Sequence, residues 1–178
     1  MIVARYCLRN LCVSTSRDPF SEVAADAAAA AAAAVLVKET GVLGLVVDIM
    51  ARHESNELHR AGVGIIYQLV SIESVDDEEA GAQMVEAVVR EGGVASLVGA
   101  LRNSPEDVDM ATVVTSSLTT MLRQMEGRPF AEGVGSIHTQ MVEAGALPVV
   151  QAAVVRFNDN PTVQGLGGEL VLALSNGE

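Results

Sequence analysis

The sequence predicts an all-α fold in which helical units of nearly equal length stack side by side. Three observations predict it: a short glycine-containing phrase recurs at even spacing, apolar residues recur at the period of a helix, and aromatic residues are scarce. Of the 178 residues, 49% are hydrophobic but only 3% are aromatic, and tryptophan is absent. An interior of Ala, Val, Leu, Ile and Met favours closely packed helices over a β-sandwich or barrel.

The recurring phrase reads "KETGVLGLV" from Lys38, "REGGVASLV" from Arg90 and "VEAGALPVV" from Val142. Its glycines are separated by 52 residues, and they are Gly41, Gly93 and Gly145. The same spacing, without a gap, aligns a small-residue column and an apolar column, which are Gly64, Ser116 and Gly168, and Ile66, Leu118 and Leu170. An alignment that keeps register over so many columns indicates an internal repeat.

Each unit is predicted to contain three helices in a fixed order. The first, clearest in "EAGAQMVEAVVREGG", ends at the glycine of the phrase. A short helix follows the glycine, and its apolar spacing predicts these core-facing residues: Leu45, Val46 and Ile49 in one unit, and Leu97, Val98 and Leu101 in the next.

A polar break then precedes a long apolar helix, such as "DMATVVTSSLTTMLRQM" or "TVQGLGGELVLALSN". Two breaks contain a helix start signal. We expect Ser104 to cap one long helix, with Pro105 at its first position, and Asn160 to cap the next, with Pro161 at its first position.

This pattern resembles the armadillo repeat. The resemblance rests on "VKETGVLGLVVDIM", "VREGGVASLVGALR" and "MVEAGALPVVQAAV" at the start of the second helix, and on "YCLRNL" and "LALSN" at the end of the third. It implies a right-handed α-α superhelix, an armadillo-like solenoid. The 52-residue unit exceeds the usual length of roughly 40 to 47, so longer loops or first helices are expected. The pattern favours armadillo over HEAT repeats, and an unclassified helical repeat is the alternative.

The alignment makes residues 1–178 a single array. Residues 1–14 are the end of a preceding repeat, 15–74 a repeat with an alanine-rich extended first helix, 75–127 a repeat, and 128–178 a repeat with an incomplete C-terminal end. Alanine has the highest helix propensity, and a low-complexity linker is the alternative for the alanine run. We expect part of a longer array, or a protein whose ends a partner covers.

Charge and cysteine content exclude several classes of partner. Eleven basic against 23 acidic residues give a net charge of −12, which disfavours nucleic acid and anionic lipid. Cys7 and Cys12 are five residues apart, on different faces of a helix, and neither has ligand-like spacing to a histidine, so we expect no bridge, metal or cofactor.

No apolar stretch reaches the roughly 20 residues that span a bilayer. A cytoplasmic or nuclear location is expected. The first 17 residues carry three arginines and no acid, which makes a mitochondrial location the alternative.

The sequence offers no constellation for catalysis, so an enzyme is not expected. No "GxSxG" turn occurs, and the histidines, His53, His59 and His138, fall at loop-like or helix-edge positions. The glycine-rich "GLGGE" from Gly165 lies inside a helix pattern and is interpreted as small residues for close helix packing.

The armadillo resemblance implies protein binding in a concave groove lined by third helices. Members that bind extended basic peptides use an Asn column and an aromatic column one turn earlier. Here these columns read Asn10, Ile72, Gln124 and Asn176, and Tyr6, Gln68, Thr120 and Leu172. The groove candidates are Tyr6, Asn10, Gln68, Gln124 and Asn176. The resemblance therefore implies a scaffold or adaptor segment that binds a peptide or partner helix. The alternative is a regulatory armadillo segment of a larger enzyme or transport receptor.

A cluster of acids suggests that the partner is basic. The segment from Glu73 to Asp109 contains ten acidic residues and only two basic ones, both arginines. The predicted acidic patch is Asp76, Asp77, Glu78, Glu79, Glu106, Asp107 and Asp109. It would steer a basic partner, and the alternative is a solvated outer face that keeps the solenoid soluble.

Overall fold

The computed structural model of the protein describes residues 41–71, 78–128 and 135–176. Its regular structure within these ranges is α-helical without a strand, which confirms the predicted all-α class. The helices are α3 (Val42–Arg52), α4 (Asn56–Val70), α5 (Glu78–Arg90), α6 (Gly93–Asn103), α7 (Val108–Gln124), α8 (Ile137–Glu143), α9 (Ala146–Arg156) and α10 (Pro161–Ser175). The alanine run, the two cysteines and the predicted repeat end at 1–14 lie outside the described residues.

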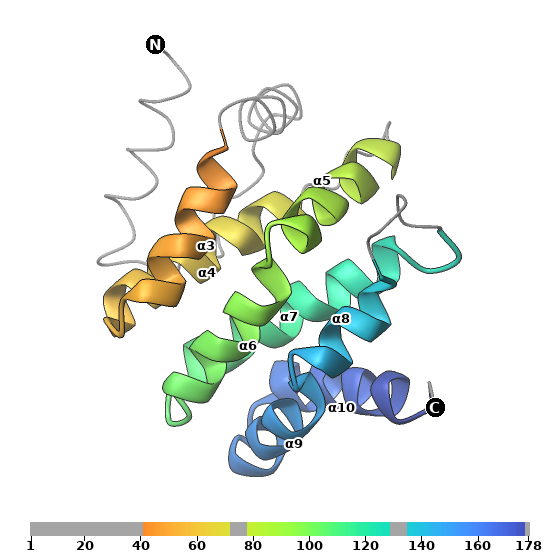
Figure 1. The fold of residues 1–178 in the computed structure, drawn as a ribbon. Coiled ribbons are helices and arrows are strands. Elements are labelled where there is room, and N and C mark those ends of the chain that lie inside the picture. The colour runs from red at the N-terminus through yellow and green to blue at the C-terminus, as the bar shows by residue number, and fades with distance from the viewer. Residues whose placement is uncertain (1–40, 72–77, 129–134, 177–178) are drawn as a thin grey trace.

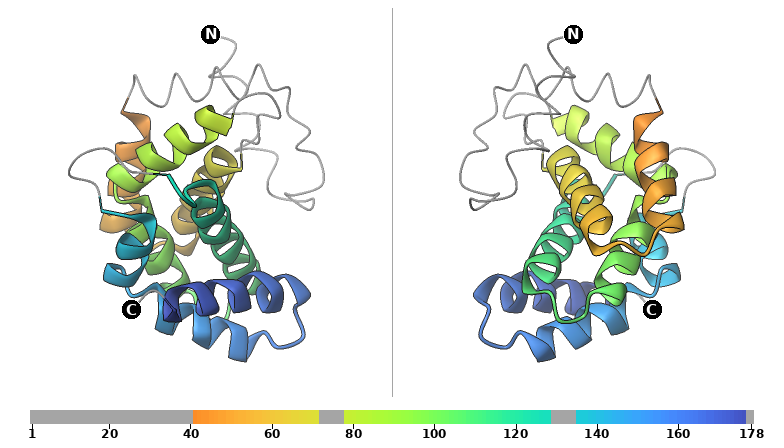
Figure 2. Two further views of the ribbon diagram at one scale, coloured as in Figure 1. Left: turned by 90° about the vertical axis from the view of Figure 1, so that its right-hand side faces the viewer. Right: turned by 90° about the vertical axis from the view of Figure 1, so that its left-hand side faces the viewer.

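The helices form two layers (Figure 1). The short helices α3, α6 and α9 lie side by side in one layer, and the long helices α4, α7 and α10 form the other, with α7 packed between α4 and α10. Each short helix packs on the long helix that follows it, and Figure 2 shows this pairing from both sides. Helices α5 and α8 precede the second and third pairs and pack against them. The order of helices therefore repeats along the chain.

Each short helix begins after a glycine with positive φ, a backbone angle that glycine adopts at no steric cost. The angles are 65° at Gly41, 82° at Gly92 and 73° at Gly145. We call this glycine the hinge of its unit. In the second unit the hinge is Gly92, so the prediction that Gly93 forms this turn was wrong. Gly93 is the first residue of α6, where a Cβ would lie 2.4 Å from Cγ1 of Val88. The two adjacent glycines are required for different reasons: one for its dihedral, the other for space.

The predicted apolar column forms the centre of the long-helix layer. Ile66, Leu118 and Leu170 occupy equivalent positions in α4, α7 and α10, and each is 0% exposed. The 52-residue register therefore holds in this layer. Methionines fill much of the remaining interior in place of aromatic rings, because the flexible thioether adapts to irregular gaps. The buried ones are Met50, Met84, Met110, Met121, Met125 and Met141.

The predicted core face of α6 is confirmed, whereas that of α3 is confirmed only for Val46, which is partly buried and packs against the core. Leu97, Val98 and Leu101 are all buried, but Leu45 of α3 is 58% exposed. The buried residues of α3 are Leu43 and Met50, which lie 51 residues before Val94 and Leu101. A register that is one residue short rotates a helix by about 100°. The gapless alignment therefore rotated the predicted core face of α3 so that it included Leu45, which is exposed.

One of the two predicted N-caps is confirmed. The amide oxygen of Asn160 accepts hydrogen bonds of 3.0 Å from the backbone of Thr162 and Val163, with Pro161 at the first position. Ser104, however, ends α6 and does not start α7, because the cap of α7 is Asp107, whose carboxylate accepts from Met110 N at 3.0 Å. Both residues are good caps, and the sequence signal could not separate two candidates three positions apart.

Histidine 59 lies in the interior, which corrects its predicted position at a helix edge. It is 3% exposed, and its Nε2 lies 3.0 Å from the carbonyl oxygen of Met50 at the end of α3. The contact ties the end of the short helix to the start of the long one. His53 is the exposed residue after α3, and His138 is half-buried in α8.

Candidate functional site

The long helices present one aligned, solvent-facing row of residues, here called the outer stripe. Its residues are three or four positions apart within each helix, so they share one helix face. This face lies opposite the buried column of Ile66, Leu118 and Leu170. Every member is exposed or half-buried. The outer stripe consists of Glu57, Ala61, Gly64 and Gln68 on α4, of Asp109, Thr112, Ser116 and Thr120 on α7, and of Gly165, Gly168, Leu172 and Asn176 at α10.

Three of the predicted groove residues are described, and they differ in availability. Gln68 and Asn176 are exposed on the outer stripe. Gln124, beside the stripe, turns inward: its Nε2 donates to the carbonyl oxygen of Val70 at 2.8 Å, at the end of α4. Its Oε1 is buried without a hydrogen-bond partner among the described groups. Gln124 therefore joins two units. Tyr6 and Asn10 lie outside the described residues.

The hydroxyl groups of α7 are also turned toward their own helix. Thr112 donates to the carbonyl oxygen of Val108 at 2.8 Å, and Ser116 donates to that of Thr112 at 2.8 Å. On the buried side, Thr115, Ser117 and Thr119 make the same bond to the residue four positions earlier. This bonding lets hydroxyl side chains lie in a helix interior without an unsatisfied donor. The middle of the outer stripe is thus polar in composition, but the hydroxyl groups of Thr112 and Ser116 already donate hydrogen bonds to their own helix.

The second of the three glycines in "GLGGE" packs tightly, and its neighbours do not. A Cβ at Gly167 would lie 2.6 Å from Cγ2 of Val154 on α9, which confirms close packing there. At Gly165 and Gly168 a Cβ would meet nothing within 4 Å, so the packing interpretation was wrong for these two. Gly64 in α4 has the same open space. Glycine inside a helix costs about 1 kcal/mol relative to alanine, and nothing packed here offsets that cost.

An ion pair between α7 and α10 borders the outer stripe. Arg123 of α7 binds the carboxylate of Glu169 on α10 through two bonds, at 2.8 and 2.5 Å. The hydrogen bond to Arg123 lowers the pKa of Glu169, and the same bond raises the pKa of Arg123. The side chains of Arg123 and Glu169 are 59% and 40% exposed, so the pair joins two units but contributes little to stability.

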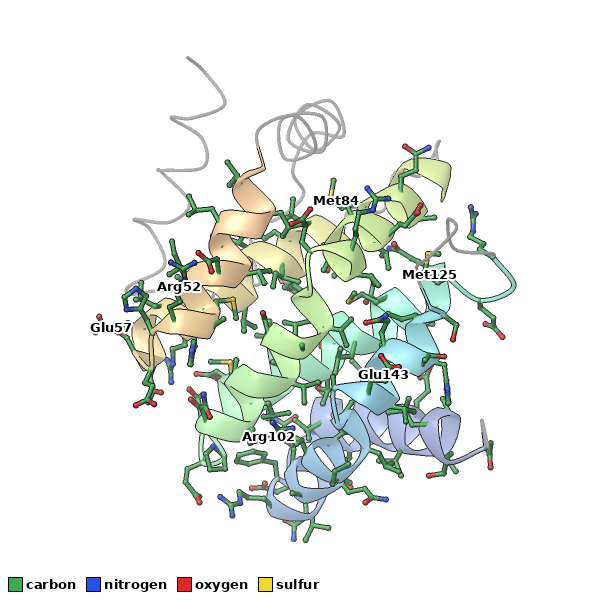
Figure 3. All side chains as sticks on the ribbon, viewed as in Figure 1. Arg52, Glu57, Met84, Arg102, Met125 and Glu143 are labelled. Atoms are coloured by element: carbon green, nitrogen blue, oxygen red, sulfur yellow. The ribbon has the colours of Figure 1, made fainter. Side chains whose placement is uncertain are left out.

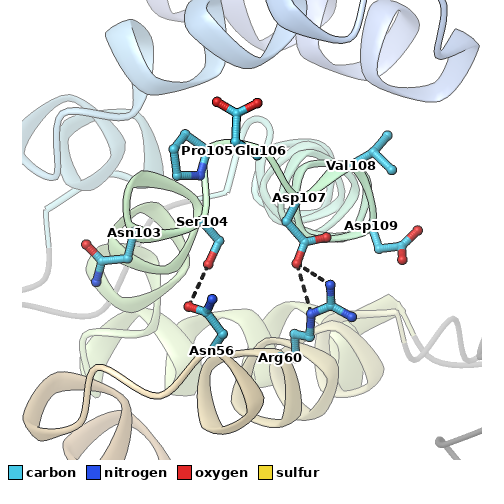
Figure 4. A pocket seen from close by; sticks show the side chains of 9 residues that line it. All are labelled: Asn56, Arg60, Asn103, Ser104, Pro105, Glu106, Asp107, Val108 and Asp109. Carbon is cyan, nitrogen blue, oxygen red and sulfur yellow. Dashed lines mark hydrogen bonds and ion pairs between the residues drawn. The ribbon is translucent and has the colours of Figure 1, made fainter.

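A shallow hollow of about 550 Å³ lies where the loop between α6 and α7 meets the start of α4 (Figure 4). Arg60 of α4 binds the carboxylate of Asp107 at 2.5 and 2.9 Å, and Ser104 donates to the amide oxygen of Asn56 at 3.1 Å. These contacts join the first unit to the second. The nine residues that line the hollow include no His, Cys or Lys, and they are Asn56, Arg60, Asn103, Ser104, Pro105, Glu106, Asp107, Val108 and Asp109.

The predicted acidic patch is partly neutralised. Asp107 pairs with Arg60, and Glu106 pairs with Arg156 of α9, which also donates to the carbonyl oxygen of Pro105 at 3.1 Å. Asp109 is exposed and has no ion pair in the described part of the chain. Asp76 and Asp77 lie outside the described residues, and Glu78 and Glu79 open α5 with side chains that are not described.

Sequence reasoning missed the arginines that connect the units. Arg60 and Arg156 reach the α6–α7 loop from either side, and Arg102 donates to the carbonyl oxygen of Ala144 at 3.1 Å (Figure 3). The available signal was spacing: Arg60 and Asp107 lie 47 residues apart, and Arg156 and Glu106 lie 50 apart. Opposite charges at nearly one repeat length indicate contacts between adjacent units.

Within the described ranges, no grouping of three or more His, Cys, Asp or Glu side chains is suited to hold a metal ion. No helix in that part of the chain is long and apolar enough to cross a membrane.

The fold and this surface define a class, an all-α chain of repeating helical units with one aligned row of exposed or half-buried residues. The chain matches no family model, no curated protein and no solved structure.

Proposed function

We propose that this protein is a non-catalytic binding module, a scaffold or adaptor segment that holds a peptide or helix of a protein partner along the outer stripe. The proposed architecture is an armadillo-like right-handed superhelix of stacked units. The alternation of short and long helices, the glycine hinges and the register of α4, α7 and α10 support it. Such stacks present extended surfaces to their partners.

One observation carries the proposal: the same positions remain uncovered in all three long helices. Gly64, Ser116 and Gly168 are each half-buried at equivalent positions, one turn from Gln68, Thr120 and Leu172. Leu172 is 66% exposed, in a helix whose opposite side is fully buried. A continuous row across three helices gives a partner segment one path to follow.

The test places a photo-crosslinking amino acid at Ser116, in the centre of the outer stripe. A matched variant places it at Gln151, an exposed position on α9 in the other layer. Each chain is irradiated in cell lysate, and the captured protein is identified, purified and titrated against the wild-type chain. We expect Ser116 to capture a protein that also binds in the titration, with no such capture from Gln151. Equal capture from both positions would show that the outer stripe is not the binding surface.

A further inference from the structure

We infer, on the basis of the proposed function, that the partner segment held on the outer stripe is an α-helix with basic residues along one flank, and not an extended chain. Three features carry this inference: the hydrogen bonds already made under the stripe, its unpaired carboxylates, and the free space above its glycines.

An extended segment brings unsatisfied backbone groups that must find partners when they leave water. Where such a segment would cross α7, the donors of Thr112 and Ser116 are bonded to backbone carbonyls of their own helix. The amide of Gln124, the position that a peptide-binding ladder requires, donates to Val70 of the neighbouring unit. On α7 this leaves the hydroxyl of Thr120, which no described group binds, while the exposed amides of the stripe, Gln68 and Asn176, lie on the flanking helix α4 and at the end of α10. A helix arrives with its backbone bonds already made.

The charges of the outer stripe complement a basic flank. Glu57 and Asp109 occupy equivalent positions near the starts of α4 and α7, and Glu57 lies at the margin of the molecule (Figure 3). Both are exposed and have no ion pair in the described part of the chain. The arginines of the same helices, Arg60 and Arg123, are bound to carboxylates. This edge therefore carries uncompensated negative charge, which Lys or Arg of a partner would neutralise.

The glycines of the outer stripe leave the helix backbone without protruding side chains. A Cβ at Gly64, Gly165 or Gly168 would meet nothing within 4 Å, so the chain itself does not require glycine there. A low surface lets a second helix approach to the interaxial distance of roughly 8 to 10 Å that packed helices adopt. Gly99 of α6 also has open space, but its counterpart in α9 is the long Gln151, so the other layer offers no equivalent row.

The inference is tested with two displayed peptide libraries of equal length, whose randomised positions have the same composition. One is presented in a helical framework, and the other is interrupted by prolines that enforce extended backbone. Each is selected on the wild-type chain, and the binders are then titrated against Gly64→Gln/Gly168→Gln and against the control Gly99→Gln. All of these substitutions point into open space, and thermal unfolding verifies that each variant is folded.

We expect helical binders whose affinity falls at least tenfold in the double variant and is unchanged by Gly99→Gln. Their affinity should also fall severalfold in Glu57→Gln/Asp109→Asn at low salt, and by less at high salt. Enrichment of extended peptides alone would overturn this inference and leave the proposed function intact. Enrichment of neither library would overturn both. Helical binders with the same affinity for the Gly64→Gln/Gly168→Gln variant as for the wild-type chain bind elsewhere, which would also overturn the inference. An affinity that is unchanged in Glu57→Gln/Asp109→Asn would overturn the inference that the partner helix has a basic flank.

Discussion

Replacing Gly168 by alanine is expected to stabilise the protein, whereas the same replacement at Gly167 is expected to destabilise it. Both residues lie inside α10, so both variants gain about 1 kcal/mol of helix propensity. At Gly168 nothing lies within 4 Å of the new Cβ, and the gain is unopposed. At Gly167 the Cβ would lie 2.6 Å from Cγ2 of Val154, a branched side chain that cannot rotate away freely. Such overpacking costs about 1 to 3 kcal/mol, which meets or exceeds the gain.

The two variants should therefore differ by about 1 to 3 kcal/mol in the free energy of unfolding. In a chain of this length, each 1 kcal/mol changes the melting temperature by roughly 2 to 4 °C. Urea unfolding followed by circular dichroism measures the difference, with unchanged denaturant dependence as the check that both variants unfold in the same way. If Gly168→Ala lowers stability, or Gly167→Ala raises it, the assignment of these two positions to open and packed surfaces is wrong.

Three further changes test the contacts inside and between units. Asp107→Ala should destabilise the protein by about 1 to 2 kcal/mol through loss of the α7 cap, whereas Asp107→Asn should keep the cap and cost less than about 1 kcal/mol; equal losses in urea unfolding would contradict the cap assignment. Glu169→Gln should cost less than about 1 kcal/mol at neutral pH. Because the hydrogen bond from Arg123 lowers the pKa of Glu169 in the folded state, the stability advantage of the wild-type chain over Glu169→Gln should be present at neutral pH and be lost as the pH falls through that lowered pKa; an advantage that grows in acid would contradict the pairing. His59→Ala should cost about 2 kcal/mol through a cavity and a lost contact to Met50, and an unchanged melting temperature would contradict its burial.

The sequence predicted the helices and the buried column well because both follow from local pattern. Ile66, Leu118 and Leu170 are large apolar residues at a constant spacing inside helices without interruption. Such positions are constrained by packing on both neighbouring helices, and their periodicity is therefore strong. The cap at Asn160 is equally local, since the side chain bonds only to residues two and three positions ahead.

The errors arose where the structure depends on a choice between neighbouring residues. Gly92 and Gly93 are both glycine, and only the three-dimensional turn decides which one takes positive φ. Ser104 and Asp107 are both caps by type, and the hydroxyl of Ser104 is instead bonded to Asn56 of the preceding unit. The hinges of the first two units are 51 and not 52 residues apart, so the buried face of α3 differs from the predicted one and Leu45 is exposed.

The candidate site was harder to predict because its chemistry depends on contacts between units. Gln124 has the composition of a groove residue, but its amide reaches Val70 of the preceding unit. Asp107 belongs to an acidic stretch of sequence, yet Arg60 neutralises it from 47 residues away. Neither partner is visible in a local window. The pairing becomes predictable only when residues about one repeat length apart are compared for opposite charge.

The glycine hinges have a consequence for how the chain tolerates changes in length. The three hinges lie 51 and 53 residues apart, while the buried column of α4, α7 and α10 keeps its constant interval. The turns before α3, α6 and α9 thus absorb a residue gained or lost without disturbing the long helices. A one-residue insertion beside Gly92 should be accommodated within the turn, with α6 keeping its buried face, whereas the same insertion inside α7 would turn Leu118 out of the interior. In the described residues, the position of the glycine hinge therefore varies between units while the buried positions of the long helices keep one interval.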